Sequence, residues 1–324
     1  MTKTFIISER GFNHWPSFDL VYEWEDEMVK FLSGARIYRK KEFLIHGKHP
    51  LQVLGQKTGW GIDSILIGNN KGFRYDMRPV LSKNPLNKPN VSNCIIDFYL
   101  RPEQLSDFYR CYDKVEHLYV TNLQVYEFLL QNKFPRKVEH MPLSLPDKYR
   151  ITENTKFDKE YDIVLCGRQN PVLMQFLESY AQTHNISYVK RGKISDGHFP
   201  YYTADGDFVG NMDTREDYFN LLRKSRVAFY STPGTDDENA QTNGFHQVTP
   251  RFLEELACGC NVLSRYDDNA DTDFYNLGEM SCKIDNYQDF ESAMDKALSS
   301  PVDMKKYARY LEEHYTSAVC ARYL

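Results

Sequence analysis

The sequence predicts an α/β protein of two doubly wound domains, and three observations lead to this fold class. Short apolar runs alternate with amphipathic helical stretches, which is typical of parallel sheets covered by helices on both faces. A polar stretch with two prolines, residues 142–160, interrupts the alternation and has the composition of a linker. The 324 residues are enough for two full cores. Two such domains place a ligand cleft at the carboxyl ends of both sheets.

The first half of the chain is expected to form one of these domains. Helices are predicted where apolar residues repeat at helical spacing, as Leu20, Trp24 and Met28 do. Strands are predicted at the short apolar runs between the helices. The expected strands are 4–8, 64–68, 94–99, 117–121 and 138–141, and the expected helices are 20–32, 102–112 and 122–132.

The alternation restarts after the linker and predicts a second domain. Residues 231–248 are expected to be a long loop, and residues 303–324 an amphipathic terminal helix. The expected strands are 162–166, 186–189, 208–209, 226–230, 261–264 and 280–284, and the other expected helices are 171–183, 214–224, 249–258 and 287–298.

Composition and charge narrow the class of protein. Hydrophobic residues make up 41% and charged residues 26%, as in ordinary soluble proteins, and the net charge of −5 argues against nucleic acid as a partner. The seven cysteines lack paired spacing, which fits a reducing cytosol. No apolar run approaches the length of a membrane span. We therefore expect a cytoplasmic protein. Peripheral contact with the inner face of the membrane through residues 36–41 is an alternative, although a solvated charge run explains that segment more simply.

Residues 244–260 are predicted to hold an anion at the start of a helix. Thr249 is suited to the N-cap position because its hydroxyl can accept from a free amide of the first turn. Pro250 suits the first helical position, and Arg251 follows it. Free amides, the positive end of the helix dipole and a guanidinium thus occur together. Gly259 is placed to end this helix.

Further cations follow the expected strands of the second domain. Arg168 comes directly after the first of these strands, and Lys190 and Arg191 come after the second. A single cation after a strand often just faces solvent. Together with Arg251, however, these side chains can meet at one edge of the sheet, as a diphosphate site requires. The sequence therefore predicts that the second domain binds a diphosphate.

Several other kinds of site are not indicated. Neither a Gly-x-Gly-x-x-Gly nor a P-loop sequence occurs, which argues against the corresponding dehydrogenases and kinases. No Asp-x-Asp stands at the end of a strand, and Asp236 and Asp237 are expected to be solvated loop charges. A reaction without metal or cofactor follows as an expectation, with side-chain cations neutralising a departing diphosphate.

Three runs carry a resemblance to a known family. They are Val-Leu-Cys-Gly-Arg after the linker, Tyr-Phe-Asn-Leu-Leu-Arg-Lys-Ser-Arg-Val-Ala-Phe-Tyr-Ser-Thr, and Thr-Pro-Arg-Phe-Leu-Glu-Glu-Leu-Ala-Cys-Gly-Cys-Asn-Val-Leu. They resemble the nucleotide-sugar half of GT-B glycosyltransferases, nearest to the bacterial group 1 and family-4-like enzymes. The resemblance covers roughly residues 160–300 and is weak in the first half of the chain.

The resemblance implies a domain organisation. Two Rossmann-like domains would face each other across a cleft, with the acceptor side in residues 1–150 and the nucleotide-sugar side in residues 151–302. The terminal helix, residues 303–324, would cross back to the first domain.

The resemblance also assigns roles in donor binding. Glu254 would bind the ribose hydroxyls, and Arg168 with a basic residue near Lys190 would bind the diphosphate. The helix start formed by Thr249, Pro250 and Arg251 would add backbone donors. The turn of Gly210, Asn211 and Met212 would lie against the base.

One position departs from the family pattern. His246 stands where relatives often have a glutamate, eight positions before Glu254, that contacts the donor sugar. The donor sugar and the stereochemical outcome therefore stay open. His246 is a candidate for contacting sugar or phosphate, and an ordinary loop histidine is the alternative.

The acceptor is expected in the first domain. Asp97 lies near the carboxyl end of an expected strand, where a carboxylate could act as a general base toward a hydroxyl. His14 and Trp15, in the loop after the first strand, could contact an acceptor sugar by hydrogen bonding and stacking. For Asp97 a structural ion pair is the alternative, and for Trp15 core packing is.

These features predict a glycosyltransferase that moves a sugar from a nucleoside diphosphate donor to a hydroxyl of a glycan or glycolipid, with surface polysaccharide assembly as the expected setting. Two alternatives remain open. One is an epimerase or hydrolase of nucleotide sugars with the same fold, and the other is a non-catalytic protein that binds sugars or nucleotides.

Overall fold

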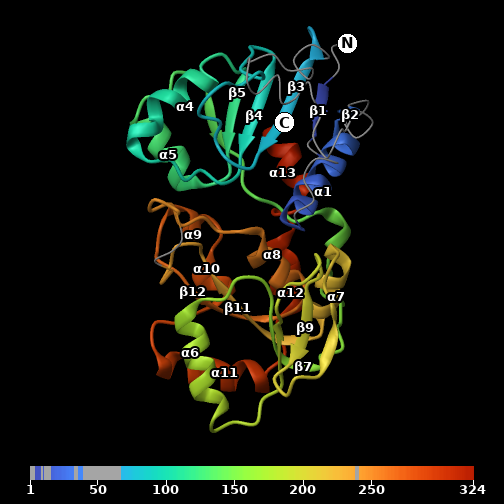
Figure 1. Cartoon of the computed structure of the whole chain (residues 1–324). Coiled ribbons are helices and arrows are strands. Elements are labelled where there is room, and N and C mark those ends of the chain that lie inside the picture. The colour runs from blue at the N-terminus through green and yellow to red at the C-terminus, as the bar shows by residue number, and fades with distance from the viewer. Residues whose placement is uncertain (1–3, 9, 11–15, 33–35, 39–66, 238–240) are drawn as a thin grey trace. The chain divides into compact units, whose positions relative to one another are not determined.

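The structure is a computed structural model that describes residues 4–8, 10, 16–32, 36–38, 67–237 and 241–324 (Figure 1). The chain divides into two compact units. Unit 1 is formed by Met1–Asp147, Gln241–Phe245 and Thr316–Leu324. Unit 2 is formed by Lys148–Ala240 and His246–Tyr315.

Unit 1 contains a six-stranded parallel sheet in the order β2-β1-β3-β4-β5-β6. The chain first adds a strand on one side of β1 and then continues on the other side. A topological switch point therefore lies at the carboxyl ends of β1 and β3. The strands are β1 (Thr4–Ile7), β2 (Arg36–Tyr38), β3 (Lys71–Asp76), β4 (Val91–Ile95), β5 (His117–Val120) and β6 (Val138–His140).

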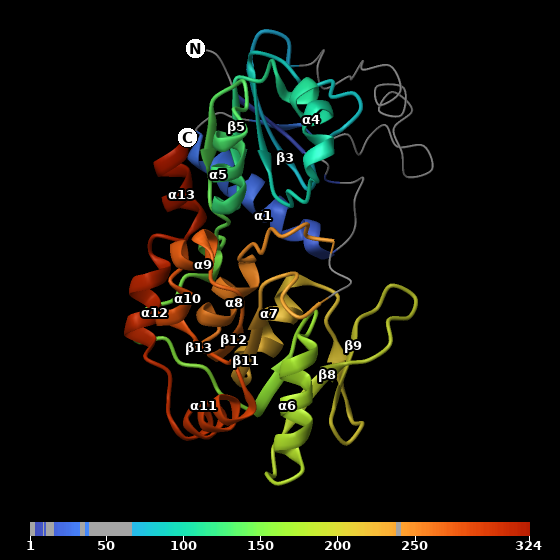
Figure 2. The same ribbon diagram turned by 90° about the vertical axis from the view of Figure 1, so that its left-hand side faces the viewer.

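Helices cover both faces of this sheet (Figures 1 and 2). On one face, Met28 and Val319 pack with Ile6 and Phe73 of the strands. On the other face, a second core of helix and strand side chains is centred on Phe108. The first pair of helices is α1 (Pro16–Phe31) and α13 (Thr316–Tyr323), and the second is α4 (Leu105–Tyr112), preceded by a 3₁₀ turn (Pro102–Gln104), and α5 (Leu123–Gln131).

The segment Gln241–Phe245 contributes to the core of unit 1 although its neighbours in sequence belong to unit 2. The ring of Phe245 packs edge-on against Phe98 and Phe128, with centroids 5.8 and 5.4 Å away. The side-chain amide of Asn243 donates to the carbonyl oxygen of Tyr99. The sequence predicted only a long loop here, because nothing local indicates that Phe245 has a distant aromatic partner.

Unit 2 contains a seven-stranded sheet in the order β10-β9-β8-β7-β11-β12-β13. Only β9 runs antiparallel to its two neighbours. The switch point of this sheet lies at the carboxyl ends of β7 and β11, because β8 was added on one side of β7 and β11 on the other. The strands are β7 (Tyr161–Leu165), β8 (Tyr188–Arg191), β9 (Pro200–Thr203), β10 (Phe208–Asn211), β11 (Ser225–Ser231), β12 (Asn261–Arg265) and β13 (Cys282–Lys283).

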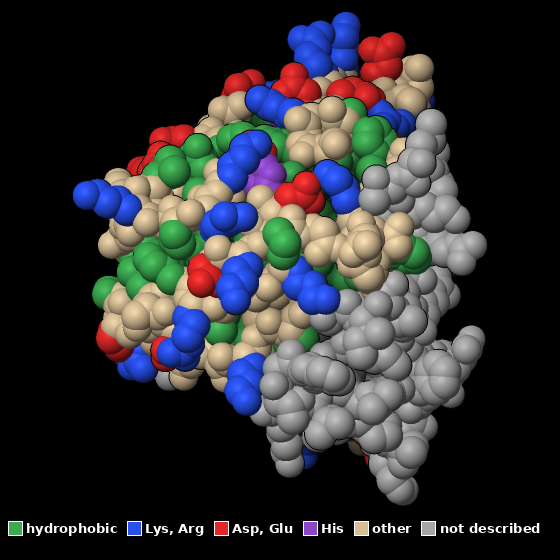
Figure 3. All heavy atoms as spheres, turned by 90° about the horizontal axis from the view of Figure 1, so that it is seen from above, with side chains coloured by type: hydrophobic (Ala, Val, Ile, Leu, Met, Phe, Trp, Pro, Cys, Tyr) green, Lys and Arg blue, Asp and Glu red, His purple; other side chains and the backbone are tan. Residues whose placement is uncertain are grey.

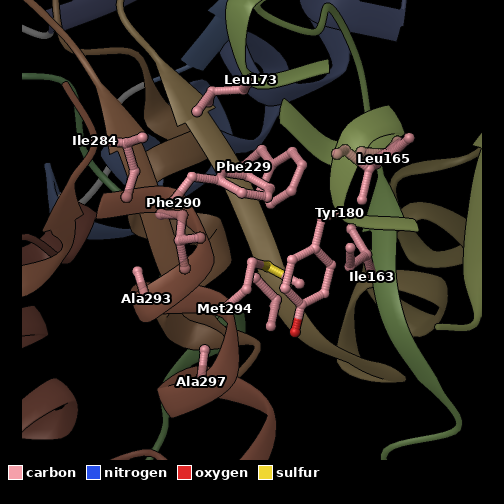
Figure 4. Close-up of a cluster of buried hydrophobic side chains, with 13 residues drawn as sticks. Ile163, Leu165, Leu173, Tyr180, Phe229, Ile284, Phe290, Ala293, Met294 and Ala297 are labelled. Atoms are coloured by element: carbon pink, nitrogen blue, oxygen red, sulfur yellow. The ribbon is translucent and has the colours of Figure 1, made fainter. Parts of the chain in front are cut away.

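The core of unit 2 lies between this sheet and the helices α6 and α11. Phe229 of β11 packs against Phe290, and Tyr180 lies beside Ile163 and Met294 (Figure 4). On the other face, Tyr230 packs against Phe252 with ring centroids 5.2 Å apart. The helices are α6 (Pro171–Ala181), α7 (Arg215–Arg223), α8 (Pro250–Ala257), α9 (Ala270–Phe274), α10 (Leu277–Met280), α11 (Tyr287–Ser299) and α12 (Met304–Leu311).

Several expected elements differ from the structure. Residue 67 is helical and residue 68 lies in a turn, so neither is part of a strand, while 64–66 lie outside the described residues. The strand nearby is β3, which was not predicted because it contains charged residues. Its Asp76 can be buried because Arg74 pairs with it at 2.8 Å and Asn93 donates to it at 3.0 Å. The strand β4 ends at Ile95, earlier than expected. The elements β9, α9 and α10 were not expected, and two helices, α12 and α13, replace the single helix expected over 303–324.

The linker predicted over 142–160 is more structured than its composition suggests. It contains a short 3₁₀ helix (Asp147–Tyr149). Leu143 and Leu145 are buried. Tyr149 stacks on Phe219 of α7 with ring centroids 3.6 Å apart. Aromatic stacking thus fixes the segment in which unit 2 begins.

The helices and the surface charges bear on the predicted peripheral contact with a membrane. No helix among the described residues is long and apolar enough to cross a bilayer. On the face that Figure 3 shows, Lys and Arg side chains are scattered among acidic, hydrophobic and uncharged ones. Of the basic segment 36–41, residues 36–38 form β2 and the remainder lies outside the described residues. Peripheral membrane contact therefore stays a prediction.

Candidate functional site

The start of α8 is positioned by Tyr230 of β11. Thr249 occupies the N-cap and Pro250 the first helical position, as predicted. The hydroxyl of Thr249, however, makes no capping bond and lies 3.4 Å from the hydroxyl of Tyr230. The backbone N–H of Thr249 donates to that same hydroxyl over 2.8 Å. The expectation of a side-chain cap was wrong. The hydroxyl of Tyr230, which local sequence does not reveal as a partner, binds Thr249 instead.

Arg251 extends from α8 across the carboxyl end of β7. Its Nη1 donates to the carbonyl oxygens of Arg168, over 2.6 Å, and of Cys166, over 3.3 Å. Its Nε lies 3.4 Å from Oε1 of Glu255, one turn along the same helix. Gly167 permits this approach: its φ is +68°, and a Cβ there would lie 3.3 Å from Nη1. The predicted meeting of Arg251 with the end of the first strand of unit 2 is thus present.

Arg168 is held at the same edge by an acidic loop. Its Nη1 lies 3.0 Å from Oδ2 of Asp237, and half of its side chain is exposed. The neighbouring Asp236 pairs with Arg265 and accepts from Asn170 over 3.0 Å. The expectation that these two aspartates are solvated was therefore wrong, because both have cationic partners. Arg168 still presents an exposed cation beside Arg251.

Lys190 lies on the neighbouring strand. It pairs in register with Leu165 of β7, is exposed, and has its Nζ 5.9 Å from the ring of Tyr188. The strand β8 extends through Lys190 and Arg191, two residues further than predicted. Both cations are therefore inside the end of the strand and not after it.

Glu254 is buried and already paired. Only 3% of the residue is exposed, and its Oε1 lies 2.7 Å from Nη1 of Arg215, the first residue of α7. Arg215 was not predicted as part of the site, since nothing in the local sequence links it to α8. The ribose-binding role of Glu254 stays a prediction, and a ribose hydroxyl would have to share this carboxylate with Arg215.

The expected base-contacting residues do not form a turn. Gly210 and Asn211 belong to β10, an outer strand of the sheet, and Met212 follows it with its N–H donating to the carbonyl oxygen of Phe199 over 2.8 Å. This segment is a strand because it pairs with β9 in a hairpin that was not predicted. The end of β10 nevertheless reaches the same edge of the sheet as the ends of β7 and β8.

A histidine–aspartate pair at this edge was also missed. His198 Nδ1 lies 2.6 Å from Oδ2 of Asp213, whose other oxygen accepts from the N–H of Phe199 over 2.9 Å. The hydrogen bond to Asp213 raises the pKa of His198. Fifteen positions separate the two residues in sequence, so only the β9–β10 hairpin brings them together.

His246 is fixed in the loop that leads to α8. Its Nδ1 lies 3.0 Å from Oδ2 of Asp267, and its carbonyl oxygen accepts from Asn269 over 3.4 Å. Two residues later, the N–H of Val248 donates to the fully buried Asp271 over 2.6 Å. Acidic residues around the start of α9 therefore hold this loop. A role of His246 toward sugar or phosphate stays a prediction.

Asp97 is the candidate base of unit 1. It lies two residues beyond the end of β4 and not inside a strand, and it is half-buried. Burial raises its pKa to about 6, while Arg78 and a hydrogen bond from the hydroxyl of Tyr99 act in the opposite direction. A carboxyl group with this pKa can accept a proton near neutral pH. The predicted acceptor residues His14 and Trp15 lie outside the described residues.

Metal ligands are not gathered in the part of the chain that the structure describes: no group of three or more His, Cys, Asp or Glu side chains is arranged to hold an ion. The cysteines are free thiols, and all except Cys282 are buried. Burial raises the pKa of both Cys258 and Cys260, the pair flanking Gly259.

Known proteins resemble this chain in structure and not in sequence. Neither a family model nor a curated protein matches the sequence. A sucrose-phosphate synthase from Thermosynechococcus elongatus matches with a TM-score of 0.56 at 11% identity, over 99% of this chain and 97% of its own. AviGT4, a glycosyltransferase involved in avilamycin A biosynthesis, matches with a TM-score of 0.51 at 9% identity, over 100% and 96%. This chain has the GT-B fold.

The GT-B fold thus extends over both units, which confirms the predicted fold class. A chain of the GtfA/B complex matches less well, with a TM-score of 0.49 at 10% identity over 86% of this chain, and this chain spans 62% of its length. At such identities the match does not carry functional residues from one GT-B protein to another. The roles of residues in this GT-B chain therefore depend on its own geometry.

Proposed function

We propose that this chain is a glycosyltransferase that takes a sugar from a nucleoside diphosphate donor and transfers it to a hydroxyl of a glycan or glycolipid acceptor. The observation that carries the proposal is the meeting of Arg168, Arg251 and the start of α8 at the switch point of unit 2. Ligands of open α/β sheets bind at such switch points, and helix starts with arginines suit phosphate groups.

The proposed mechanism is stabilisation of the leaving diphosphate. As the bond between the sugar and the diphosphate breaks, negative charge grows on the phosphate oxygens. The guanidinium of Arg251 is already held in place by two carbonyl oxygens, and Arg168 and Lys190 add positive charge at neighbouring strand ends. Charges fixed before the reaction stabilise a transition state without reorganisation.

Asp97 is proposed to accept the proton of the acceptor hydroxyl. The acceptor would bind to unit 1, and surface polysaccharide assembly in the cytoplasm or at the inner face of the membrane is the proposed setting. His246 would contact the sugar or phosphate, Glu254 the ribose, and the end of β10 the base.

The nucleotide prediction is tested by thermal shift with UDP, GDP, ADP, CMP and dTDP compounds. One diphosphate at a hundred times its Kd should stabilise the protein by about 2.7 kcal/mol, or roughly 5 °C in Tm. The matching nucleoside without phosphates is the control and should shift Tm much less. If no nucleotide shifts Tm, the proposed diphosphate site is refuted. If the diphosphate binds, product analysis with and without acceptor separates a transferase from an epimerase, a hydrolase or a binding protein.

Metal independence is a separate prediction. Because side-chain cations are proposed to neutralise the diphosphate, kcat should change less than about twofold when EDTA is added and again when Mg²⁺ or Mn²⁺ is restored. Initial rates at saturating donor measure this effect. A loss of more than about tenfold that the metal reverses would show that a divalent cation does this work.

A further inference from the structure

Glu255 is a buried carboxyl group whose role the proposed mechanism does not explain. Only 2% of the residue is exposed, although it adjoins the equally buried Glu254 on α8. Its Oε1 lies 3.4 Å from Nε of Arg251. Its Oε2 is enclosed and accepts no hydrogen bond from any described residue. Burial raises the pKa of Glu255 to about 8, while Arg251 lowers it.

Such a group is a poor source of stability. Replacing a buried ion pair by apolar side chains is often neutral or stabilising, and an enclosed oxygen without a donor carries a desolvation cost. Polar groups kept under these conditions are frequently found at functional sites. The environment of Glu255 therefore points to a role other than holding unit 2 together.

What Glu255 contacts is one side of the Arg251 guanidinium. Another side is held by the carbonyl oxygens of Cys166 and Arg168, which accept from Nη1. The guanidinium carbon lies 5.4 Å from the ring centroid of Tyr230. Nε is enclosed and makes no hydrogen bond, and Nη2 donates to no described residue. Because 16% of the Arg251 side chain remains exposed, a ligand oxygen can reach the guanidinium.

We propose that Glu255 is a positioning residue that fixes the guanidinium of Arg251 across the carboxyl end of β7, with Nη2 directed to an oxygen of the donor diphosphate. The inference rests on the proposed function, because it takes the anion at this edge to be a diphosphate. A fixed guanidinium loses less conformational freedom when the ligand binds, and this increases affinity for the phosphates. The affinity for the nucleoside part of the donor does not depend on this fixed guanidinium.

The test compares Glu255→Leu and Glu255→Gln with the wild-type chain. Calorimetry measures the Kd of the nucleoside diphosphate found by the thermal-shift panel and of the same nucleoside without phosphates. In Glu255→Leu the diphosphate should bind about tenfold more weakly, roughly the cost of ordering one long side chain on binding. Nucleoside affinity should stay unchanged. Glu255→Gln keeps an acceptor oxygen and the side-chain volume, and should recover part of the loss.

Glu160→Leu is the matched control. It removes a glutamate that pairs with Lys224 over 3.0 Å, next to the amino end of β7, and should leave both affinities unchanged. If Glu255→Leu binds the diphosphate as tightly as wild type, or weakens diphosphate and nucleoside equally, Glu255 has no positioning role. If wild type binds no nucleoside diphosphate at all, the proposed function fails and this inference fails with it. If the leucine variant does not fold, the diphosphate and nucleoside affinities of Glu255→Gln test the proposal instead.

Discussion

Replacing Arg251 by alanine should lower kcat/KM about 100- to 1,000-fold, the usual effect of removing one fixed donor from a developing anion. The variant loses one cation of the proposed diphosphate site and also the two bonds that tie α8 to the carbonyl oxygens of Cys166 and Arg168. Initial rates with the donor found by the nucleotide panel measure the effect. Near-normal turnover would remove Arg251 from the mechanism.

The same substitution should also affect folding, which the sequence did not indicate. Breaking a buried ion pair by removing one partner typically costs about 3–5 kcal/mol. The cost here should be at the lower end, because burial already raises the pKa of Glu255 to about 8, and losing Arg251, which lowers that pKa, lets the carboxyl group take up a proton. The double variant Arg251→Met with Glu255→Leu is the control. It should keep the wild-type Tm or exceed it, while losing as much turnover as the alanine variant.

Replacing Asp97 by asparagine should lower kcat by roughly a hundredfold to ten-thousandfold, as the loss of a general base does.

The same substitution should also raise Tm above neutral pH. The pKa of Asp97 in the folded protein, about 6, lies above the ordinary value of 3.8 because burial disfavours the ionised carboxylate. Folding is therefore weakened as pH rises from about 4 to about 6, by up to about 3 kcal/mol, and asparagine escapes this loss.

The pH profile provides the decisive measurement for Asp97. A base must be deprotonated to act, so the wild-type rate should rise through a pH of about 6. The asparagine variant should keep only a residual rate without this limb, and its Tm should depend less on pH between about 4 and 6. An active variant with the wild-type profile would make Asp97 a structural residue, the alternative considered from the sequence.

The alternation of apolar runs and helical stretches was sufficient to predict the fold class. Residues such as Ile163, Leu165 and Phe229 lie in strands buried on both faces, and such strands are continuous apolar runs that sequence reveals. The strand β3 was missed because it contains charged residues: Asp76 is paired with Arg74 of the same strand and accepts hydrogen bonds from Asn93 of β4 and Tyr112 of α4, which are distant in sequence. The hairpin of β9 and β10 was missed because only its second strand was predicted, at residues 208–209, and because β9 is four residues long with a single fully buried residue.

The site was predicted where local chemistry determines it. The start of α8 follows from Thr249 and Pro250 alone, and the approach of Arg168 to Arg251 follows from the rule that parallel strands end at one edge. The pairing of Arg251 with Glu255 could also have been recognised from their spacing of four on a helix. Arg215, Tyr230 and Asp267 could not, because tertiary contacts alone bring them to Glu254, Thr249 and His246.

The composition of unit 1 from three separated segments has a consequence for the order of events on the ribosome. Its core includes Val319 and Cys320, which are synthesised after all of unit 2, and Phe245, which is synthesised in the middle of unit 2. Domains usually fold as they emerge, the amino-terminal one first. Here the strands of unit 1 emerge first but leave part of their apolar surface uncovered until residues 316–324 arrive. The nascent chain therefore has a longer period of vulnerability to aggregation and proteases than the length of unit 1 alone implies.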